Sequence, residues 1–213
     1  MSHPFTGAHW IWLPQDEPVE NHYVNFRRRF RLDVVPGSAR AHLAVDTDFV
    51  LYLNGAEIAR GQYSDYPERK TYTSVDVAPH LRAGENVIAV LAYYKGRNFS
   101  TYRKGMPGLI FALDGVLVSD GTWQARQSPA YRSGAMPVVT VQLGFTAEFD
   151  ARREDDWTAV DYAGDGWAPA RALAGPTDGY WTALLPRPVP LLTLLPPRPA
   201  KLVAQGSFIR RGE

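Results

Sequence analysis

The 213-residue chain contains no cysteine, which excludes a disulfide framework, a thiolate nucleophile and a cysteine-based zinc site. Histidine is also scarce, and the five residues are too scattered to have metal-ligand spacing. Those histidines are His3, His9, His22, His42 and His80. Because a chain without cysteine suits a reducing compartment, we expect a cytoplasmic protein.

An excess of charge of either sign is lacking too. The chain has 23 Lys and Arg against 22 Asp and Glu, a net charge of +1, so no overall field favours nucleic acid or an anionic membrane. The longest apolar run, residues 87–94, is far too short to span a bilayer, and the N-terminus lacks the basic and apolar regions of a signal peptide. We therefore expect neither nucleic acid nor a membrane as a partner.

What the chain does contain is enough apolar material, at 45% hydrophobic and 12% aromatic residues, for one substantial core. Its strongest local signal lies at residues 46–61. Phe49, Leu51 and Leu53 alternate on one face, and Asn54-Gly55 suits the two positive-φ positions of a type I′ turn. This stretch predicts a β-hairpin.

Alternation with a period of two recurs along the first two thirds of the chain, and almost no helical period is present. The alternating segments are 23–32, 39–45, 71–77, 109–113, 116–118, 123–126 and 138–143. The continuous apolar run at 87–92 indicates a central strand covered on both faces. Trp10 and Trp12 suit an edge strand or a lid on the sandwich. We expect their indole rings to belong to the core rather than to form a stacking platform for a sugar. Together these segments predict an all-β sandwich.

We divide the chain into three parts. Residues 1–145 form the β-sandwich domain. Residues 146–185 are acidic and interrupted by glycine and proline. We expect an irregular segment that packs on the sandwich through Trp157 and Trp167. Residues 186–213 form a Pro-rich linker, and the strand-like stretch 201–210 is expected to start a further domain. The chain thus reads as the front part of a larger protein, either a fragment or a free-standing module.

Three blocks in this order, 48–55, 76–90 and 149–170, resemble the N-terminal region of bacterial α-L-rhamnosidases of glycoside hydrolase family 78. The first two blocks also occur in jelly-roll sugar-binding domains of the β-galactosidase and β-glucuronidase superfamily. The third block follows the first two at a separation along the chain that is similar to that in the rhamnosidases, and it favours this family over the other superfamily. The resemblance implies a galactose-binding-like jelly-roll sandwich.

The resemblance also implies that catalysis belongs elsewhere. In that family the carboxylates that hydrolyse the substrate lie in a later (α/α)₆ barrel, which this sequence does not contain, so no catalytic residue is carried over. The local carboxylates crowd around Arg152 and Arg153, which favours ion pairing. They are Glu148, Asp150, Glu154, Asp155 and Asp156.

We interpret the chain as a non-catalytic accessory domain that binds a rhamnose-containing carbohydrate and contacts the remaining domains of a parent hydrolase. Two alternatives stay open: the chain is itself an α-L-rhamnosidase, or it is a purely structural or protein-interaction sandwich. The oligomeric state does not follow from the sequence.

Two polar-aromatic loops, 62–70 and 93–105, supply rings for the C–H face of a sugar and planar groups for its hydroxyls. The candidate sugar-binding residues are Tyr63, Asp65, Tyr66 and Arg69 in the first loop, and Tyr94, Arg97, Asn98, Tyr102 and Arg103 in the second. The competing interpretation is that both loops pack against other domains.

No cofactor is expected. Asp46, Asp48 and Asn54 offer oxygen ligands near a turn and leave structural calcium as an option, but they form no recognised calcium loop. Hydrogen bonding at the end of the hairpin is the better explanation of these residues.

Overall fold

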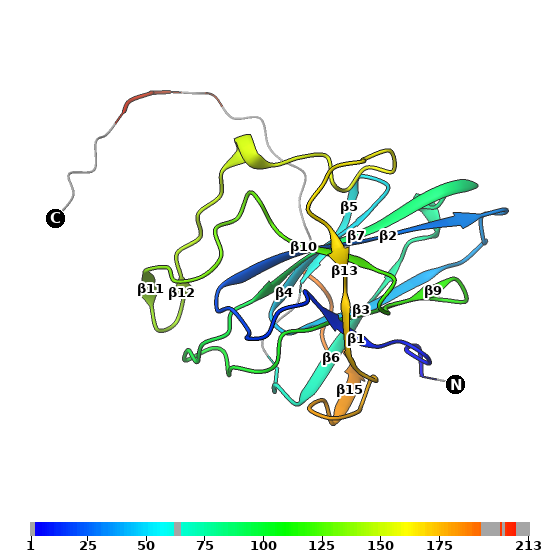
Figure 1. Cartoon of the computed structure of the whole chain (residues 1–213), viewed down its shortest axis with the longest axis horizontal. Coiled ribbons are helices and arrows are strands. Elements are labelled where there is room, and N and C mark those ends of the chain that lie inside the picture. Colours follow the sequence, from blue (N-terminus) through cyan, green and yellow to red (C-terminus); the bar gives the residue numbers. More distant parts are fainter. Residues whose placement is uncertain (1–2, 62–64, 193–200, 202, 208–213) are drawn as a thin grey trace.

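The computed structural model describes residues 3–61, 65–192, 201 and 203–207, and its fold is a sandwich of two β-sheets (Figure 1). The first sheet consists, in spatial order, of β14 (Arg171–Ala174), β1 (Trp10–Trp12), β8 (Leu109–Leu113), β3 (Arg40–Val45), β6 (Arg69–Asp76) and β15 (Ala183–Pro186). A short strand, β9 (Leu117–Val118), pairs with β8. The pairing of β15 with β6 is parallel, whereas the other pairs in this sheet are antiparallel.

The second sheet is antiparallel and consists, in order, of β13 (Ala168–Pro169), β10 (Gln124–Gln127), β2 (His22–Leu32), β7 (Gly84–Tyr94), β4 (Asp48–Leu53) and β5 (Ala56–Gly61). A separate hairpin of β11 (Val138–Thr140) and β12 (Gly144–Phe145) projects away from the sandwich (Figure 1). Within the described residues the helical elements are two single 3₁₀ turns, η1 (Ala78–His80) and η2 (Ala151–Arg153). The all-β prediction is confirmed, while the jelly-roll connectivity stays a prediction. No helix in the described part of the chain is long and apolar enough to cross a membrane.

The core lies between the two sheets and follows the alternation in the sequence. Val24 and Phe26 of β2 face Leu43 of β3 and Phe111 of β8 in one apolar cluster. Strand β7 lies between β2 and β4, and its residues Val87, Ile88, Ala89 and Val90 are all 0% exposed. The prediction that the continuous apolar run at 87–92 forms a central strand covered on both faces is therefore confirmed.

The hairpin predicted at residues 46–61 is formed by β4 and β5. Asn54 (φ 54°) and Gly55 (φ 87°) take the two left-handed positions of the turn. The Asn54 side chain also accepts a hydrogen bond from the backbone N–H of Val87 (2.9 Å) and donates one to Oδ1 of Asn86 (2.9 Å). These bonds tie the tip of the hairpin to the central strand β7.

The prediction of an edge strand at Trp10 and Trp12 is wrong, because β14 pairs with the open side of β1. Trp10 is 0% exposed and stacks on Trp181, with ring centroids 4.4 Å apart. Trp12 is 2% exposed. Both indoles therefore belong to the core, as the sequence favoured, and neither is a platform for sugar.

The segment 146–185 packs on the sandwich and contributes three strands, which differs from the irregular chain expected there. Each of these three strands lies at the edge of a sheet. There a strand is held mainly by backbone hydrogen bonds to its single neighbour, which do not depend on an alternating pattern of apolar side chains. The sequence at 146–185 therefore shows little alternation. The strand expected at 201–210 is not formed by residue 201 or by residues 203–207. Its remaining positions and most of the Pro-rich linker lie outside the described residues.

Two buried arginines hold this segment on the outer face of the second sheet. The guanidinium carbon of Arg126 lies 4.5 Å from the ring centroid of Trp167 and 5.6 Å from that of Tyr162. Arg126 also pairs with Asp155 at 2.5 Å, and Arg27 donates a hydrogen bond to the carbonyl oxygen of Tyr162 (3.2 Å). The arginine–carboxylate pairing expected from the sequence is present, with arginines supplied by the sheet as well.

His22 makes the stability of the fold depend on pH. The residue is 0% exposed, and burial lowers the pKa of its imidazole from 6.5 to about 4, which the nearby Gln127 side chain opposes in part. The unfolded chain therefore binds a proton at His22 more tightly than the folded chain does. We expect the free energy of unfolding to fall by about 3 kcal/mol as the pH drops from 6.5 to 4, and to lose no more from this group below that.

Urea unfolding across this pH range, compared with a His22→Gln variant, tests the prediction. The variant removes the titrating group, so the difference between the two stability curves should slope only between pH 6.5 and 4. Parallel curves for the two proteins would contradict it.

Candidate functional site

The two polar-aromatic loops meet at one hollow of about 520 Å³, at the end of the sandwich where β3 passes into β4. We call it the loop hollow. Its lining residues are Tyr66, Pro67 and Glu68 from the first loop, Asn98, Phe99, Tyr102, Arg103 and Lys104 from the second, and Tyr180. It thus combines four aromatic rings with an amide, a carboxylate and two cations.

Two of these rings are accessible. Tyr66 is 64% exposed and Tyr180 is 39% exposed, whereas Tyr102, at 3%, is buried. The side chains of Arg103 and Lys104 are exposed as well. The hollow therefore offers ring faces and charged groups side by side, which is the usual composition of a site for a polar cyclic ligand.

The first loop is held by Asp65. One carboxylate oxygen accepts hydrogen bonds from the backbone N–H (2.7 Å) and the hydroxyl (3.0 Å) of Thr71, and the other accepts from Nζ of Lys70 (2.9 Å). A turn follows, in which the N–H of Arg69 donates to the carbonyl oxygen of Tyr66 (3.1 Å). These bonds tie the part of the loop from Asp65 onward to the start of β6.

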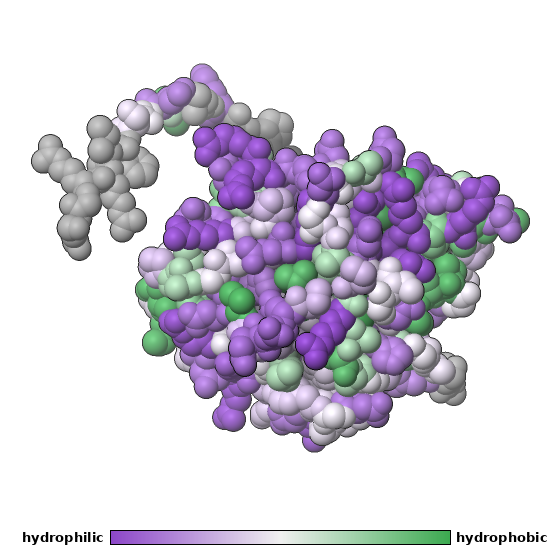
Figure 2. Space-filling model, viewed as in Figure 1, coloured by the Kyte–Doolittle hydropathy of each residue, from purple (hydrophilic) through white to green (hydrophobic). Residues whose placement is uncertain are grey.

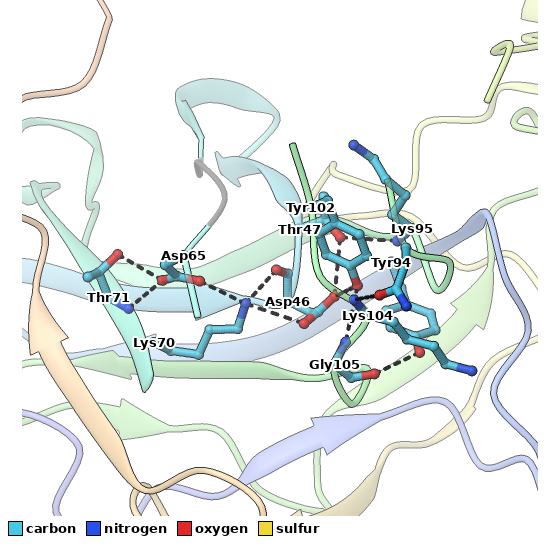
Figure 3. A network of polar contacts seen from close by, with 11 residues as sticks. Asp46, Thr47, Asp65, Lys70, Thr71, Tyr94, Lys95, Tyr102, Lys104 and Gly105 are labelled. Atoms are coloured by element: carbon cyan, nitrogen blue, oxygen red, sulfur yellow. Dashed lines mark hydrogen bonds and ion pairs between the residues drawn. The ribbon is translucent and has the colours of Figure 1, made fainter. Parts of the chain in front are cut away.

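Lys70 lies at the centre of a buried polar network beneath the hollow (Figure 3). Its side chain is 1% exposed, and Nζ donates to the carbonyl oxygen of Asp46 (2.6 Å) while lying 3.3 Å from its carboxylate. Burial raises the pKa of Asp46, and the neighbouring ammonium opposes this shift. The network joins the β3–β4 corner to the first loop.

The second loop is attached to the same network. The hydroxyl of Tyr102 donates to the carboxylate of Asp46, and the hydroxyl of Tyr94 donates to the carbonyl oxygen of Gly105 (2.8 Å). Burial raises the pKa of Tyr102, and the Asp46 charge adds to this shift. Gly105 itself is required by the close approach, because a Cβ there would lie 2.7 Å from Oδ1 of Asp46.

Four of the predicted sugar-binding residues line the loop hollow: Tyr66, Asn98, Tyr102 and Arg103. Of these, Tyr66 and Arg103 present exposed side chains, while Tyr102 offers only the little surface that its burial leaves. Asn98 also stabilises its own loop, because its Oδ1 accepts the backbone N–H of Lys104 (2.8 Å). Tyr63 lies outside the described residues.

The other predicted site residues are not in the hollow. Asp65 is occupied by the buried network, and Tyr94 is 1% exposed and belongs to the core. Arg97 pairs with Glu20 at 2.5 Å. Arg69 is exposed at the start of β6 but does not line the hollow. Tyr94 could have been excluded from the sequence, because it has the inward parity of β7.

Glu68, Phe99, Lys104 and Tyr180 were missed as candidate residues. Glu68, Phe99 and Lys104 lie inside the two predicted loops. For these three the loops were predicted correctly, and only the selection of individual binding residues within them was wrong. No local pattern in the sequence marked Tyr180, because its position depends on contacts with residues more than a hundred positions away in the chain. The backbone N–H of Thr182 donates to the carbonyl oxygen of Glu68 (2.7 Å), just before β15 pairs with β6.

A calcium site from Asp46, Asp48 and Asn54 is not supported. Asp46 is committed to Lys70 and Tyr102, and both side-chain atoms of the Asn54 amide serve the hairpin turn. Within the described residues, no group of three or more His, Asp or Glu side chains is placed to hold a metal.

A larger hollow of about 860 Å³ lies beside the N-terminal segment, next to a hydrogen-bonded row of Ser74, His42 and Asp114. His42 contacts Ser74 through Nδ1 (2.7 Å) and Asp114 through Nε2 (2.9 Å). Ser74 lies within the regular β3–β6 ladder, directly opposite His42, rather than on a turn that could direct backbone N–H groups at a reacting carbonyl. We therefore assign this row a structural role.

Replacing Lys70 by methionine tests the buried network. The change leaves Asp46 and Asp65 without their shared cation, so we expect the free energy of unfolding in urea to fall by about 3 to 5 kcal/mol. The exposed pair of Arg60 and Glu57 provides a matched control, since Arg60→Ala should cost less than about 1 kcal/mol. Equal losses in the two variants would refute a central role for Lys70.

Comparison with known proteins places this geometry in a family. Residues 36–189 match the family model described as the α-L-rhamnosidase N-terminal domain. An α-L-rhamnosidase of Streptomyces avermitilis is 28% identical over 205 residues, which cover 90% of this chain and 20% of that enzyme. The chain thus spans about a fifth of the length of this curated relative.

Solved structures show the same relationship. A GH78 family rhamnosidase of Bacillus sp. GL1 superposes with a TM-score of 0.80 at 34% identity, covering 86% of this chain and 20% of the enzyme. A lectin from Pleurotus ostreatus, in complex with GalNAc, shares the fold alone, with a TM-score of 0.55 at 16% identity over 86% of this chain and 48% of the lectin. The chain therefore belongs to the α-L-rhamnosidase N-terminal domain family.

Proposed function

We propose that this chain is a non-catalytic, carbohydrate-binding accessory domain of an α-L-rhamnosidase-like glycoside hydrolase. The single observation that carries the proposal is the convergence of two exposed rings, Tyr66 and Tyr180, with Asn98 and Arg103 at one hollow. A sugar can lay its C–H face on such a ring while the amide and guanidinium bond its hydroxyls. A rhamnose-containing carbohydrate is the ligand class we propose.

The comparisons support this proposal at the level of architecture. The relatives that match the chain are rhamnosidases, and a neighbour in fold, the Pleurotus lectin, is described in complex with the sugar GalNAc. The same fold thus occurs in a protein described with a bound sugar, and loops held by a rigid scaffold are common binding sites in proteins.

The carboxylates of the chain favour a non-catalytic role. An inverting glycosidase needs a carboxylic acid whose pKa is raised and a second carboxylate across the scissile bond. Here Arg152 holds the pKa of Asp150 below its usual range, and Glu148 pairs with Arg132. Asp155 is occupied by Arg126. These three carboxylates lie in ion pairs with arginines, so the hydrolysis is proposed to depend on other domains of the parent enzyme.

Those other domains need a contact surface, and we propose the β11–β12 hairpin for it. Val139, Val141 and Leu143 are 50%, 60% and 68% exposed, and Figure 2 shows hydrophobic colour gathered over this projecting hairpin. Exposed apolar patches of this kind mark interaction sites. The contact surface lies beside the loop hollow, because Phe145 of β12 packs on Phe99 at 5.2 Å.

Calorimetric titration of the 213-residue chain with L-rhamnose and rhamnose-containing oligosaccharides tests the sugar site. We expect measurable binding that weakens about fivefold in Tyr66→Ala, because the variant removes an exposed ring face. Phe149→Ala is the matched control, since Phe149 is 48% exposed but packs against Tyr131 and does not line the loop hollow, so the change should leave the affinity unchanged.

The same protein should release no p-nitrophenol from p-nitrophenyl α-L-rhamnoside. Release that disappears in Asp150→Asn would replace the binding proposal by the enzyme alternative. The absence of sugar binding at millimolar concentrations would instead leave the purely structural alternative.

A further inference from the structure

The charges around the loop hollow are one-sided. Arg103 and Lys104 line it, and Nζ of Lys95 lies 5.7 Å from the ring centroid of Phe99 and 5.4 Å from that of Tyr102. Against these three cations, Glu68 is the one carboxylate that lines the hollow in the described part of the chain. For a protein whose net charge is +1, this is a local concentration of positive charge.

The neighbouring acids lie in ion pairs with other cations, although Asp46 and Asp65 share one ammonium and so keep one unit of negative charge within the buried network. Asp46 and Asp65 share the buried Lys70, and Glu20 pairs with Arg97. The side chains of Arg103 and Lys104 make no hydrogen bond or ion pair with any residue that the structure describes. Both are therefore open to an anionic group on a ligand.

The turn that carries these two cations is fixed before any ligand arrives. Phe99 and Tyr102 exchange two backbone hydrogen bonds (2.9 and 3.3 Å), Tyr102 is anchored to Asp46, and the N–H of Lys104 is held by Asn98. Such preorganisation lowers the entropic cost of binding. Arg103 and Lys104 consequently project from a rigid turn beside the exposed ring of Tyr66.

We propose that the loop hollow selects saccharides that carry a carboxylate, that is, uronic acids, over neutral sugars of the same ring shape. This inference rests on the proposed sugar site and names its ligand class. A planar carboxylate matches the guanidinium fork of Arg103, and the ammonium of Lys104 adds a second charge-assisted bond. Glu68 disfavours the carboxylate on its own side, so the uronate would orient its acid group toward the second loop and its hydroxyls toward Glu68.

Matched pairs of sugars test this selection. The affinities of D-galacturonate and D-galactose, and of D-glucuronate and D-glucose, are compared by calorimetry on the 213-residue chain. We expect each uronate to bind about fivefold more tightly than its neutral partner at low salt, and the ratio to shrink as salt is raised.

Substitutions locate the effect. The Arg103→Gln/Lys104→Gln double variant should bring the ratio close to one. It should also weaken binding of the neutral sugar, because Arg103 is one of the proposed partners of the sugar hydroxyls. Arg40→Gln, at the opposite end of β3, removes an exposed cation elsewhere and should leave the ratio unchanged. A preference for uronates that survives in the double variant would overturn the assignment to these residues.

The result also separates the two proposals. Equal binding of the uronate and its neutral partner overturns the selection for a carboxylate and leaves the sugar site standing. If neither member of any pair binds and rhamnose does not bind either, the sugar site itself fails.

Discussion

Lys70 is the residue on which the end of the sandwich that carries the two polar-aromatic loops depends. An ammonium that is 1% exposed is stable only if oxygen atoms replace its lost water, and here those oxygens come from Asp46 and Asp65. Asp46 also accepts the hydroxyl of Tyr102. One buried cation therefore links the β3–β4 corner, the first loop and, through Asp46 and Tyr102, the second loop. The positions of the carboxylates that compensate the charge of Lys70 thus set the shape of the loop hollow.

The long-range pairing of β15 with β6 is the second constraint on the site. It carries the preceding segment across the mouth of the loops and adds Tyr180 as an exposed wall. The same passage buries Trp181 against Trp10. Extension of the first sheet by β15 and formation of the hollow are thus two results of one strand pairing, which explains why a residue at position 180 helps to form a hollow built mainly from residues 66–104.

Burial decided which aromatic residues of the two loops can meet a ligand. Tyr66, Tyr94 and Tyr102 look alike in composition, yet they are 64%, 1% and 3% exposed. The parity of β7 could have identified Tyr94 as inward, since Ile88, Val90 and Ala92 share its side. Tyr102 lies in an irregular loop, where no period exists, so its burial could not be predicted.

Patterns within the amino-acid sequence were enough to predict the all-β class, the turn at Asn54-Gly55, the covered strand β7 and the two loops that supply the candidate site. Each of these follows from residues close together in the chain, through side-chain alternation or turn conformation. Three other features became visible only in the folded chain: the pairing of β14 with β1, the burial of Lys70 and the position of Tyr180 at the hollow. The physical reason is that compensation of a buried charge and pairing at a sheet edge depend on partners distant in sequence, which no local pattern records.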